Sequence, residues 1–181
     1  MRAVLALGAN LGDRAAALQA AVDAIDRANR VVALSAIFET TPVGGPSQPD
    51  FYNAVVVVDT KLAAIELLDL AHRIEDAAGR VRLEHWGPRT LDVDVLAYGD
   101  LRSDDPVLTL PHPRAHERAF VLLPWLDADP AARIVGLGAV ADLAATVDTD
   151  GVRRLEQPSL RWAGASSTTG AAGAAGDGEG R

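Results

Sequence analysis

Two aspartates separated by one residue are the first candidates for chemistry in this sequence. Asp92 and Asp94 lie in the segment LDVDVLAY, which alternates polar and apolar residues as a strand with one buried face does. Both carboxylates therefore leave one face of the strand, ~7 Å apart. Hard divalent cations prefer oxygen ligands of this kind, so the pair is a candidate metal site. The alternative is an ordinary polar strand face, which an Asp-x-Asp pattern alone does not exclude.

A basic segment, RVRLEHWGPRT, precedes the aspartate pair. It sets four basic residues against one acid, Glu84: Arg80, Arg82, His85 and Arg89. Metal ions bridge phosphate oxygens, and guanidinium groups neutralise the charge that remains. The two segments together predict a site for a metal-bound polyphosphate, and a solvated basic loop is the alternative. Trp86 either anchors this loop in the core or covers a bound ligand.

A second basic cluster lies in PHPRAHERAF, with four basic residues in ten positions: His112, Arg114, His116 and Arg118. Histidine and arginine in a loop interrupted by proline favour phosphate binding over core packing. A His-x3-His zinc pair is a weaker alternative, since no third ligand follows at a suitable spacing.

The segment TPVGGPSQPDFYN predicts a loop that presents backbone amides and carbonyls to a ligand. Asn53 at a strand start can hydrogen-bond a polar heterocycle, and Phe51 or Phe120 can stack on its face. Taken singly, each of these residues fits a structural role equally well. Gly8 and Asn10 in LGANLGD predict a glycine turn before a helix. The chain has no P-loop motif, so a nucleotide must be held in another way.

These residues lie among segments that alternate between strand and helix patterns. Strands are expected over 2–8, 31–39, 52–60 and 91–98, and helices over 13–28, capped by Asp13, and 62–78, ended by Gly79. This order is β-α-β-β-α-β. It predicts an α+β fold with a ferredoxin-like core, a mainly antiparallel sheet with helices packed on it. A short strand near 105–110 and extra C-terminal helices near 116–127 and 136–147 complete the expected elements.

Length and composition limit the possible classes of protein. The chain has 181 residues, 49% hydrophobic and 23% charged, as expected for one domain, which we assign to residues 1–162. Residues 163–181 contain no apolar residue larger than alanine and predict a disordered tail. The absence of cysteine excludes disulfides and thiolate metal sites, and the net charge of −8 argues against nucleic-acid binding. No apolar run has the length of a membrane span, so we expect a cytoplasmic protein, and no heptad pattern demands an oligomer.

Taken together, these segments resemble the 6-hydroxymethyl-7,8-dihydropterin pyrophosphokinases of folate biosynthesis. The resemblance runs from LGANLGD through FETTPVGGPSQPDFYNAV and GRVRLEHWGPRTLDVDVLAYG to LPHPRAHERAFVLLP, in the right order and spacing. It implies transfer of pyrophosphate, as one unit, from ATP to the hydroxymethyl group of the pterin, with release of AMP. ATP is then a co-substrate, the partners of the chain are small molecules, and a monomer is the expected oligomeric state.

The resemblance also implies roles for individual residues. Two magnesium ions would be held by Asp92 and Asp94, which with Arg82 and Arg89 form the catalytic set. The pterin contacts map onto Thr41, Pro42, Gly44, Phe51, Asn53, Trp86 and Phe120. The ATP contacts map onto Glu75, Arg80, Arg82, Trp86, Arg89, His112 and Arg118. The chain departs from the family pattern at Pro113, His85 and Gly44.

Two other functions remain open on the sequence. A non-catalytic module of the same fold could bind a small ligand and regulate a partner, and it would need no paired aspartates beside an arginine-rich loop. Another magnesium-dependent phosphoryl or nucleotidyl transferase could use a different acceptor. Magnesium-dependent turnover of ATP separates the first alternative from the kinase, and the choice of acceptor separates the second.

Overall fold

The computed structural model describes residues 1–42, 48–79 and 90–165 of the chain. Its central strand is β4 (Phe51–Asp59), whose run of four valines is buried on both faces. Strand β1 (Arg2–Ala9) pairs with β4 along its whole length, and β5 (Asp92–Tyr98) pairs with the other side of β1. All pairings in this sheet are antiparallel, so the α+β class with an antiparallel sheet is confirmed.

Two short strands share the other side of β4. Strand β2 (Arg30–Leu34) pairs with its second half, and β3 (Phe38–Thr40) pairs with its first three residues. Strand β10 (Val152–Arg154) then pairs with β3 and extends the sheet. Outside this sheet, two hairpins of two-residue strands are formed by β6 (Ser103–Asp104) with β7 (Thr109–Leu110) and by β8 (Arg133–Ile134) with β9 (Gly138–Ala139).

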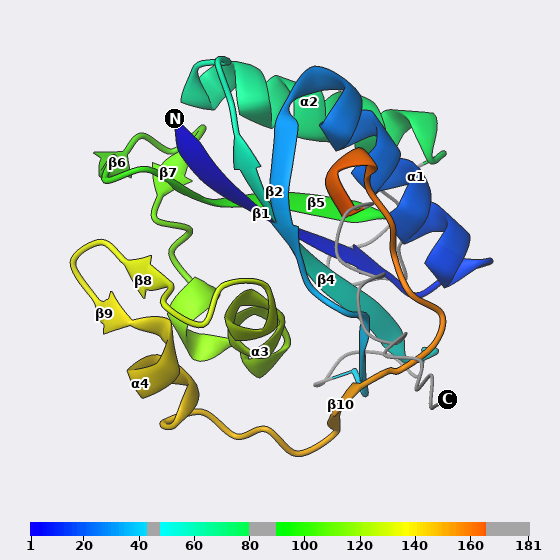
Figure 1. Cartoon of the computed structure of the whole chain (residues 1–181). Coiled ribbons are helices and arrows are strands. Elements are labelled where there is room, and N and C mark those ends of the chain that lie inside the picture. Colours follow the sequence, from blue (N-terminus) through cyan, green and yellow to red (C-terminus); the bar gives the residue numbers. More distant parts are fainter. Residues whose placement is uncertain (43–47, 80–89, 166–181) are drawn as a thin grey trace, which may run out of the picture.

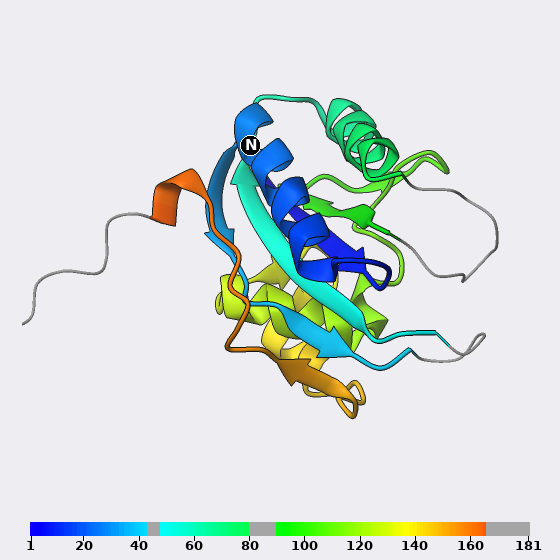
Figure 2. The ribbon, with the colours of Figure 1, turned by 90° about the vertical axis from the view of Figure 1, so that its right-hand side faces the viewer.

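Helices cover both faces of the sheet (Figures 1 and 2). Helices α1 (Arg14–Ala28) and α2 (Ala64–Ala77) lie on one face, and α3 (Ala119–Ala128) and α4 (Val140–Ala144) lie on the other. A one-turn 3₁₀ helix, η1 (Ala115–Glu117), precedes α3, and a second, η2 (Ala163–Ala165), follows the last strand. Each face therefore has its own apolar core.

The ends of the first two helices follow the sequence signals. Asp13 precedes α1, and its Oδ1 accepts a hydrogen bond from the amide of Ala16 at 3.0 Å, as an N-cap does. Gly79 follows α2 with a φ of 72°, a left-handed conformation that glycine adopts at little cost. The predicted start of α1 and the predicted end of α2 are both confirmed.

The strand predicted over 31–39 is interrupted, and this is a correction. Ser35 donates its amide to the carbonyl of Val55 at 3.0 Å, but its hydroxyl, in place of a backbone carbonyl, accepts from the amide of Val55 at 2.9 Å. The register against β4 then shifts by one residue before Phe38 pairs with Asn53. A side chain that takes a ladder hydrogen bond thus inserts one extra residue, as in a β-bulge.

Other predicted boundaries also change. The strand expected near 105–110 is the small β6–β7 hairpin, and the helices expected near 116–127 and 136–147 are the shorter α3 and α4. Gly8 lies inside β1 rather than in a turn, and Gly12, with a φ of 64°, is the turn glycine before α1. Strand β10 was not predicted, because its side chains carry no alternating apolar pattern and its partner is far away in sequence.

The C-terminal segment leaves β10 and runs along α1. Gln19 exchanges two hydrogen bonds with the backbone of Arg161, and the amide of Ala163 donates to Oδ2 of Asp26 at 3.0 Å. Most of the predicted tail, 166–181, lies outside the described residues. Within the described ranges, no helix combines the length and the apolar character that crossing a bilayer requires.

Candidate active site

One row across the sheet brings three polar or small positions together. Gly8 of β1 pairs with Asn53 of β4 on one side and with Asp92 of β5 on the other. Residues directly opposite each other in antiparallel strands share a face, so the amide and the carboxylate flank a position that has no side chain. A Cβ at Gly8 would lie only 3.2 Å from Oδ1 of Asn53. The next row pairs Ala6 with Asp94, on the same face.

The aspartate pair of β5 lies on the α3 side of the sheet. Val93 and Val95 pack into the core under α1 and α2, whereas Asp92 and Asp94 alternate with them and are half-buried. The common face that the sequence predicts for the two carboxylates is present. Both make further interactions within the protein.

Glu75 holds the strand between the two aspartates. Its side chain comes from α2 and is 2% exposed, and Oε1 accepts a hydrogen bond from the amide of Val93 at 2.9 Å. Because β5 lies at the edge of the sheet that the described residues form, no strand among them pairs with this amide. Glu75 therefore satisfies a buried backbone donor. The sequence suggested only an ATP contact for this residue, and that role stays a prediction.

His112 lies beside the aspartates, in the loop between β7 and η1. Its amide donates to the carbonyl of Leu96 in β5 at 2.9 Å, and its Nδ1 accepts from the amide of Arg114 at 3.2 Å. Since Nδ1 is an acceptor, the proton of the neutral ring is on Nε2. Burial lowers the pKa of His112 below its usual value, although the charge of Asp94 raises it in part.

The charged groups that act on the pKa of His112 come from two other elements. Asp94, Arg118 and Asp92 all act on its pKa, the two carboxylates raising it and the guanidinium lowering it. Residues from β5, from the loop before η1 and from the start of α3 are thus near one another. Their charges are mixed, with two carboxylates beside one guanidinium and a neutral imidazole. Such a set suits a ligand that carries both metal ions and phosphates.

Aromatic and amide groups lie along the same face. Phe120, in the first turn of α3, is half-buried, with the guanidinium carbon of Arg118 5.6 Å from its ring centroid. Phe51 is half-buried at the start of β4, and Asn53 is 7% exposed. One amide with aromatic rings nearby can bind the edge and the face of a flat heterocycle.

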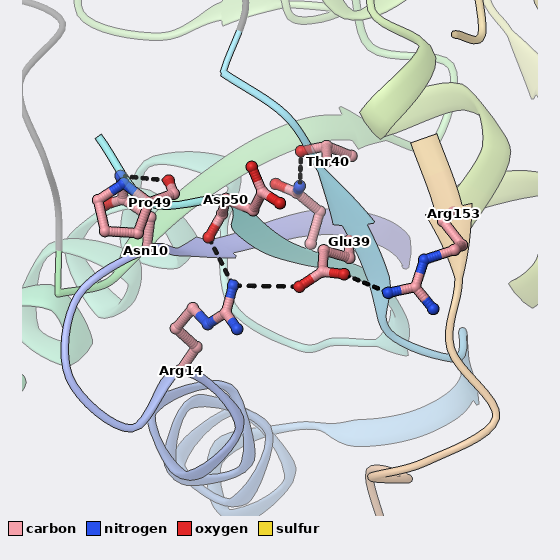
Figure 3. Close-up of polar contacts among 8 residues, drawn as sticks. Asn10, Arg14, Glu39, Thr40, Pro49, Asp50 and Arg153 are labelled. Atoms are coloured by element: carbon pink, nitrogen blue, oxygen red, sulfur yellow. Dashed lines mark hydrogen bonds and ion pairs between the residues drawn. The ribbon is translucent and has the colours of Figure 1, made fainter. Parts of the chain in front are cut away.

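Thr40 joins this set, and the sequence analysis missed it. Its hydroxyl accepts a hydrogen bond from Nδ2 of Asn53 at 2.8 Å, and the residue is 5% exposed (Figure 3). The predicted Thr41 is exposed instead, with its amide bonded to the carbonyl of Gly151 at 3.2 Å. Pro42 is half-buried. The predicted strand ended at residue 39, one residue before Thr40, so the alternation from Phe38 to Thr40 was a signal that it left unused.

Five predicted site residues lie outside the described residues: Gly44, Arg80, Arg82, Trp86 and Arg89. Among the residues that are described, no group of three or more acidic, histidine or cysteine side chains is arranged to hold a metal ion. Two carboxylates are nevertheless what magnesium uses when phosphates and water complete its coordination. The Asp92 and Asp94 pair fits that donor set.

Comparison with known proteins identifies the family. The family model for 7,8-dihydro-6-hydroxymethylpterin-pyrophosphokinase matches residues 4–130, which include every site residue described above. The chain belongs to this pyrophosphokinase family. The 2-amino-4-hydroxy-6-hydroxymethyldihydropteridine pyrophosphokinase of Methylorubrum extorquens is 45% identical over 157 residues, covering 86% of this chain and 99% of that protein. The pyrophosphokinase of the same name from Pseudomonas aeruginosa is 42% identical, covering 85% and 96% of the two chains.

Solved structures support the fold of this pyrophosphokinase family member. Wild-type HPPK-DHPS of Plasmodium falciparum superposes with a TM-score of 0.62 at 16% identity. The match covers 80% of this chain but only 44% of the Plasmodium chain, so this chain resembles one part of that longer protein. At this identity the likeness concerns the fold alone.

Proposed function

We propose that this chain transfers the pyrophosphoryl group of ATP to the hydroxymethyl group of 6-hydroxymethyl-7,8-dihydropterin, releasing AMP, as a step of folate biosynthesis. Residues 1–162 would act as a single domain built on a ferredoxin-like β-α-β-β-α-β order. The observation that carries the proposal is the row Asn53–Gly8–Asp92, in which an amide that can hydrogen-bond a heterocycle lies beside a carboxylate of the kind that binds metal ions. The family relationship supplies the substrates that fit the two ends of this row.

The acceptor would lie at the Asn53 end of the row. Asn53 is held by Thr40, so its amide keeps one orientation toward the edge of a pterin. Phe51 and Phe120 would bound the two faces of the ring. Thr41, Pro42 and Gly44 keep their predicted pterin contacts as part of this proposal, and Thr40 is added to them.

The ATP phosphates would lie at the Asp92 end. Asp92 and Asp94 would hold two magnesium ions, which when bound neutralise charge on the phosphates. Arg118 adds a positive charge beside them. His112 can donate Nε2–H to a phosphate oxygen, since Nδ1 already accepts from Arg114. Glu75 maintains the strand geometry between the two aspartates.

The transfer itself needs positioning more than a dedicated base. The hydroxymethyl oxygen attacks the β-phosphorus, the bond from that phosphorus to the bridging oxygen of AMP breaks, and the hydroxyl proton passes to solvent. AMP keeps the electron pair of the broken bond. The row across the sheet contributes by holding both reactants in line. The predicted catalytic role of Arg82 and Arg89 falls on residues outside the described ranges and stays a prediction.

The first experiment measures AMP release from ATP labelled at the β-phosphorus, with magnesium, in the presence and absence of the pterin. Pterin-dependent AMP, with the label on the pterin, is expected. Release of ADP would indicate that only the γ-phosphate is transferred, so that ATP binds in a geometry different from the one proposed. Tight pterin binding without turnover would favour the non-catalytic module.

Two variants test the metal site. Asp92→Asn and Asp94→Asn should each lower kcat at least ~100-fold, because metal stabilisation of the transition state amounts to several kcal/mol. Asp100→Asn is the matched control, since Asp100 is an exposed acid just beyond the end of β5. Equal activity of all three variants would contradict the assignment of the pair. The predicted monomeric state and cytoplasmic location stay predictions.

A further inference from the structure

The face of the sheet opposite the proposed pterin site carries a network of charged side chains. Arg14, the first residue of α1, places Nη1 2.7 Å from the carbonyl oxygen of Asp50 and 3.4 Å from Oε1 of Glu39. Glu39 lies in β3, and its other carboxylate oxygen is paired with Arg153 of β10. Figure 3 shows the guanidinium of Arg14 joined to both Asp50 and Glu39, with Arg153 on the far side of Glu39.

Strand alternation places this network of charged side chains directly behind the residues of the proposed pterin site. Glu39 and Tyr52 are directly opposite each other in the β3–β4 pair, on the face away from Phe51 and Asn53. The guanidinium carbon of Arg14 lies 3.7 Å from the ring centroid of Tyr52, a cation–π contact. Arg14 thus contacts the residue before Phe51 and the residue after it.

The contacts of Arg14 are partly shielded from water. Its side chain is 24% exposed and that of Glu39 is 20% exposed, against 68% for Arg153. A hydrogen bond from a guanidinium to a carbonyl is stronger than one between neutral groups, and partial burial reduces its screening. The hydrogen bond to the carbonyl of Asp50 also connects the residue before β4 to α1, whose first turn is capped by Asp13.

A second anchor acts on the same segment from the loop before α1. Nδ2 of Asn10 donates to Oε1 of Gln48 at 2.9 Å and to the carbonyl of Pro49 at 3.3 Å. The chain from Gln48 to Tyr52 is therefore bound at successive positions by one loop and the helix that follows it. In the β1–β4 pair, Asn53 lies opposite Gly8, two residues upstream of Asn10.

We propose that Arg14 is a positioning residue for the acceptor end of the site. Through Asp50 and Tyr52 it holds the start of β4, so that Phe51 and Asn53 meet the pterin in one geometry. Glu39 orients the guanidinium, and Arg153 holds Glu39 from β10. Arg14 itself does not touch either substrate. This role rests on the proposed function, because it assigns the pterin to Phe51 and Asn53.

The test compares binding of the two substrates in an Arg14→Met variant. Methionine keeps an apolar stem that can lie on Tyr52 but has no hydrogen-bond donor and no charge. We expect the Kd of the pterin, measured by titration calorimetry with magnesium and a non-hydrolysable ATP analogue, to rise ~10-fold. The Kd of the ATP analogue alone should stay within about twofold, since the metal end of the row is held by other residues.

Two further variants keep the result interpretable. Arg30→Met is the matched control: Arg30 pairs with Asp59 at 3.5 Å, is 80% exposed and lies at the opposite end of β4. It should leave both dissociation constants unchanged. Glu39→Gln keeps the shape of Glu39 and removes its charge, so it should weaken pterin binding in the same direction by a smaller factor, about threefold.

The outcomes separate the two proposals. Pterin binding that is unchanged in Arg14→Met, or loss of affinity for both substrates alike, would overturn the positioning role while leaving the proposed function standing. If Arg14→Met does not fold, an unchanged pterin Kd in Glu39→Gln would overturn it in the same way. A wild-type protein that neither binds the pterin nor releases AMP in its presence would overturn the proposed function, and the positioning role with it.

Discussion

Adding one methyl group at Gly8 tests the geometry of the acceptor site most directly. In a Gly8→Ala variant the new Cβ would lie 3.2 Å from Oδ1 of Asn53, shorter than an ordinary van der Waals contact of 3.4–4 Å, and no other side chain among the described residues lies within 4 Å of it. Asn53 must then shift by a few tenths of an ångström. The shift strains its 2.8 Å hydrogen bond to Thr40, which fixes the orientation of the amide.

The size of the effect follows from that hydrogen bond. A neutral hydrogen bond contributes about 0.5–1.5 kcal/mol, and 1.4 kcal/mol is a factor of ten in binding. We therefore expect KM for the pterin to rise about threefold to tenfold, with KM for ATP unchanged. Alanine in a strand is about 0.5–1 kcal/mol more favourable than glycine, so the net change in the free energy of unfolding should be near zero.

Steady-state AMP release at varied pterin and saturating ATP measures the first quantity, and thermal unfolding measures the second. Asn53→Ala removes the atom that the new methyl group would approach. Adding Gly8→Ala to that background should then change KM for the pterin by less than about twofold, because the two effects share one contact. Full additivity of the two substitutions, or an unchanged KM in Gly8→Ala alone, would refute the reasoning.

Three other predictions follow from single contacts. Glu75→Ala leaves the buried amide of Val93 without a partner and should lower the free energy of unfolding by about 1–3 kcal/mol in urea denaturation, whereas Asp69→Ala, exposed on the same helix, should change it by less than about 0.5 kcal/mol. Phe120→Ala should raise KM for the pterin about tenfold and leave KM for ATP unchanged in the AMP assay; an equal rise for both would place Phe120 elsewhere. Burial lowers the pKa of His112 in the folded protein below its ordinary value of 6.5. As the pH falls, the unfolded chain therefore binds a proton at this residue before the folded protein does. The free energy of unfolding of metal-free wild type should consequently decrease below pH 6.5. His112→Asn should remove that part of the pH dependence in denaturant titrations, and an identical pH profile for the variant would contradict the assignment.

Much of the local structure could be predicted from residue patterns. The alternation of Asp92 and Asp94 with valines, the Asp13 cap and the Gly79 stop depend on contacts within a few residues, and all three are present in the fold. The family resemblance also rested on local sequence, because each of its motifs is a contiguous segment. Local patterns failed at Ser35, where a side-chain hydroxyl takes the place of a backbone acceptor and the register differs between the β2–β4 and β3–β4 pairings.

The composition of the candidate site could be predicted only in part. Asn53, Asp92 and His112 were named from their types, but no pattern placed Asn53 and Asp92 on either side of Gly8. Thr40 was missed in favour of its neighbour, since choosing between them requires the register of β3 against β4. Arg14 carried no signal at all, because its partners lie 25 and 36 residues away.

The sequence by itself determined most of the strands and helices, which side chains of a strand share a face, and which family the motifs resemble. These follow from periodicity and short-range hydrogen bonding, which each segment carries with it. Only the tertiary structure decided that β1 lies between β4 and β5, that Glu75 supports the strand between the aspartates, and that Arg14 holds the start of β4. Strand order and register depend on packing the whole core at once, so no segment contains that information alone.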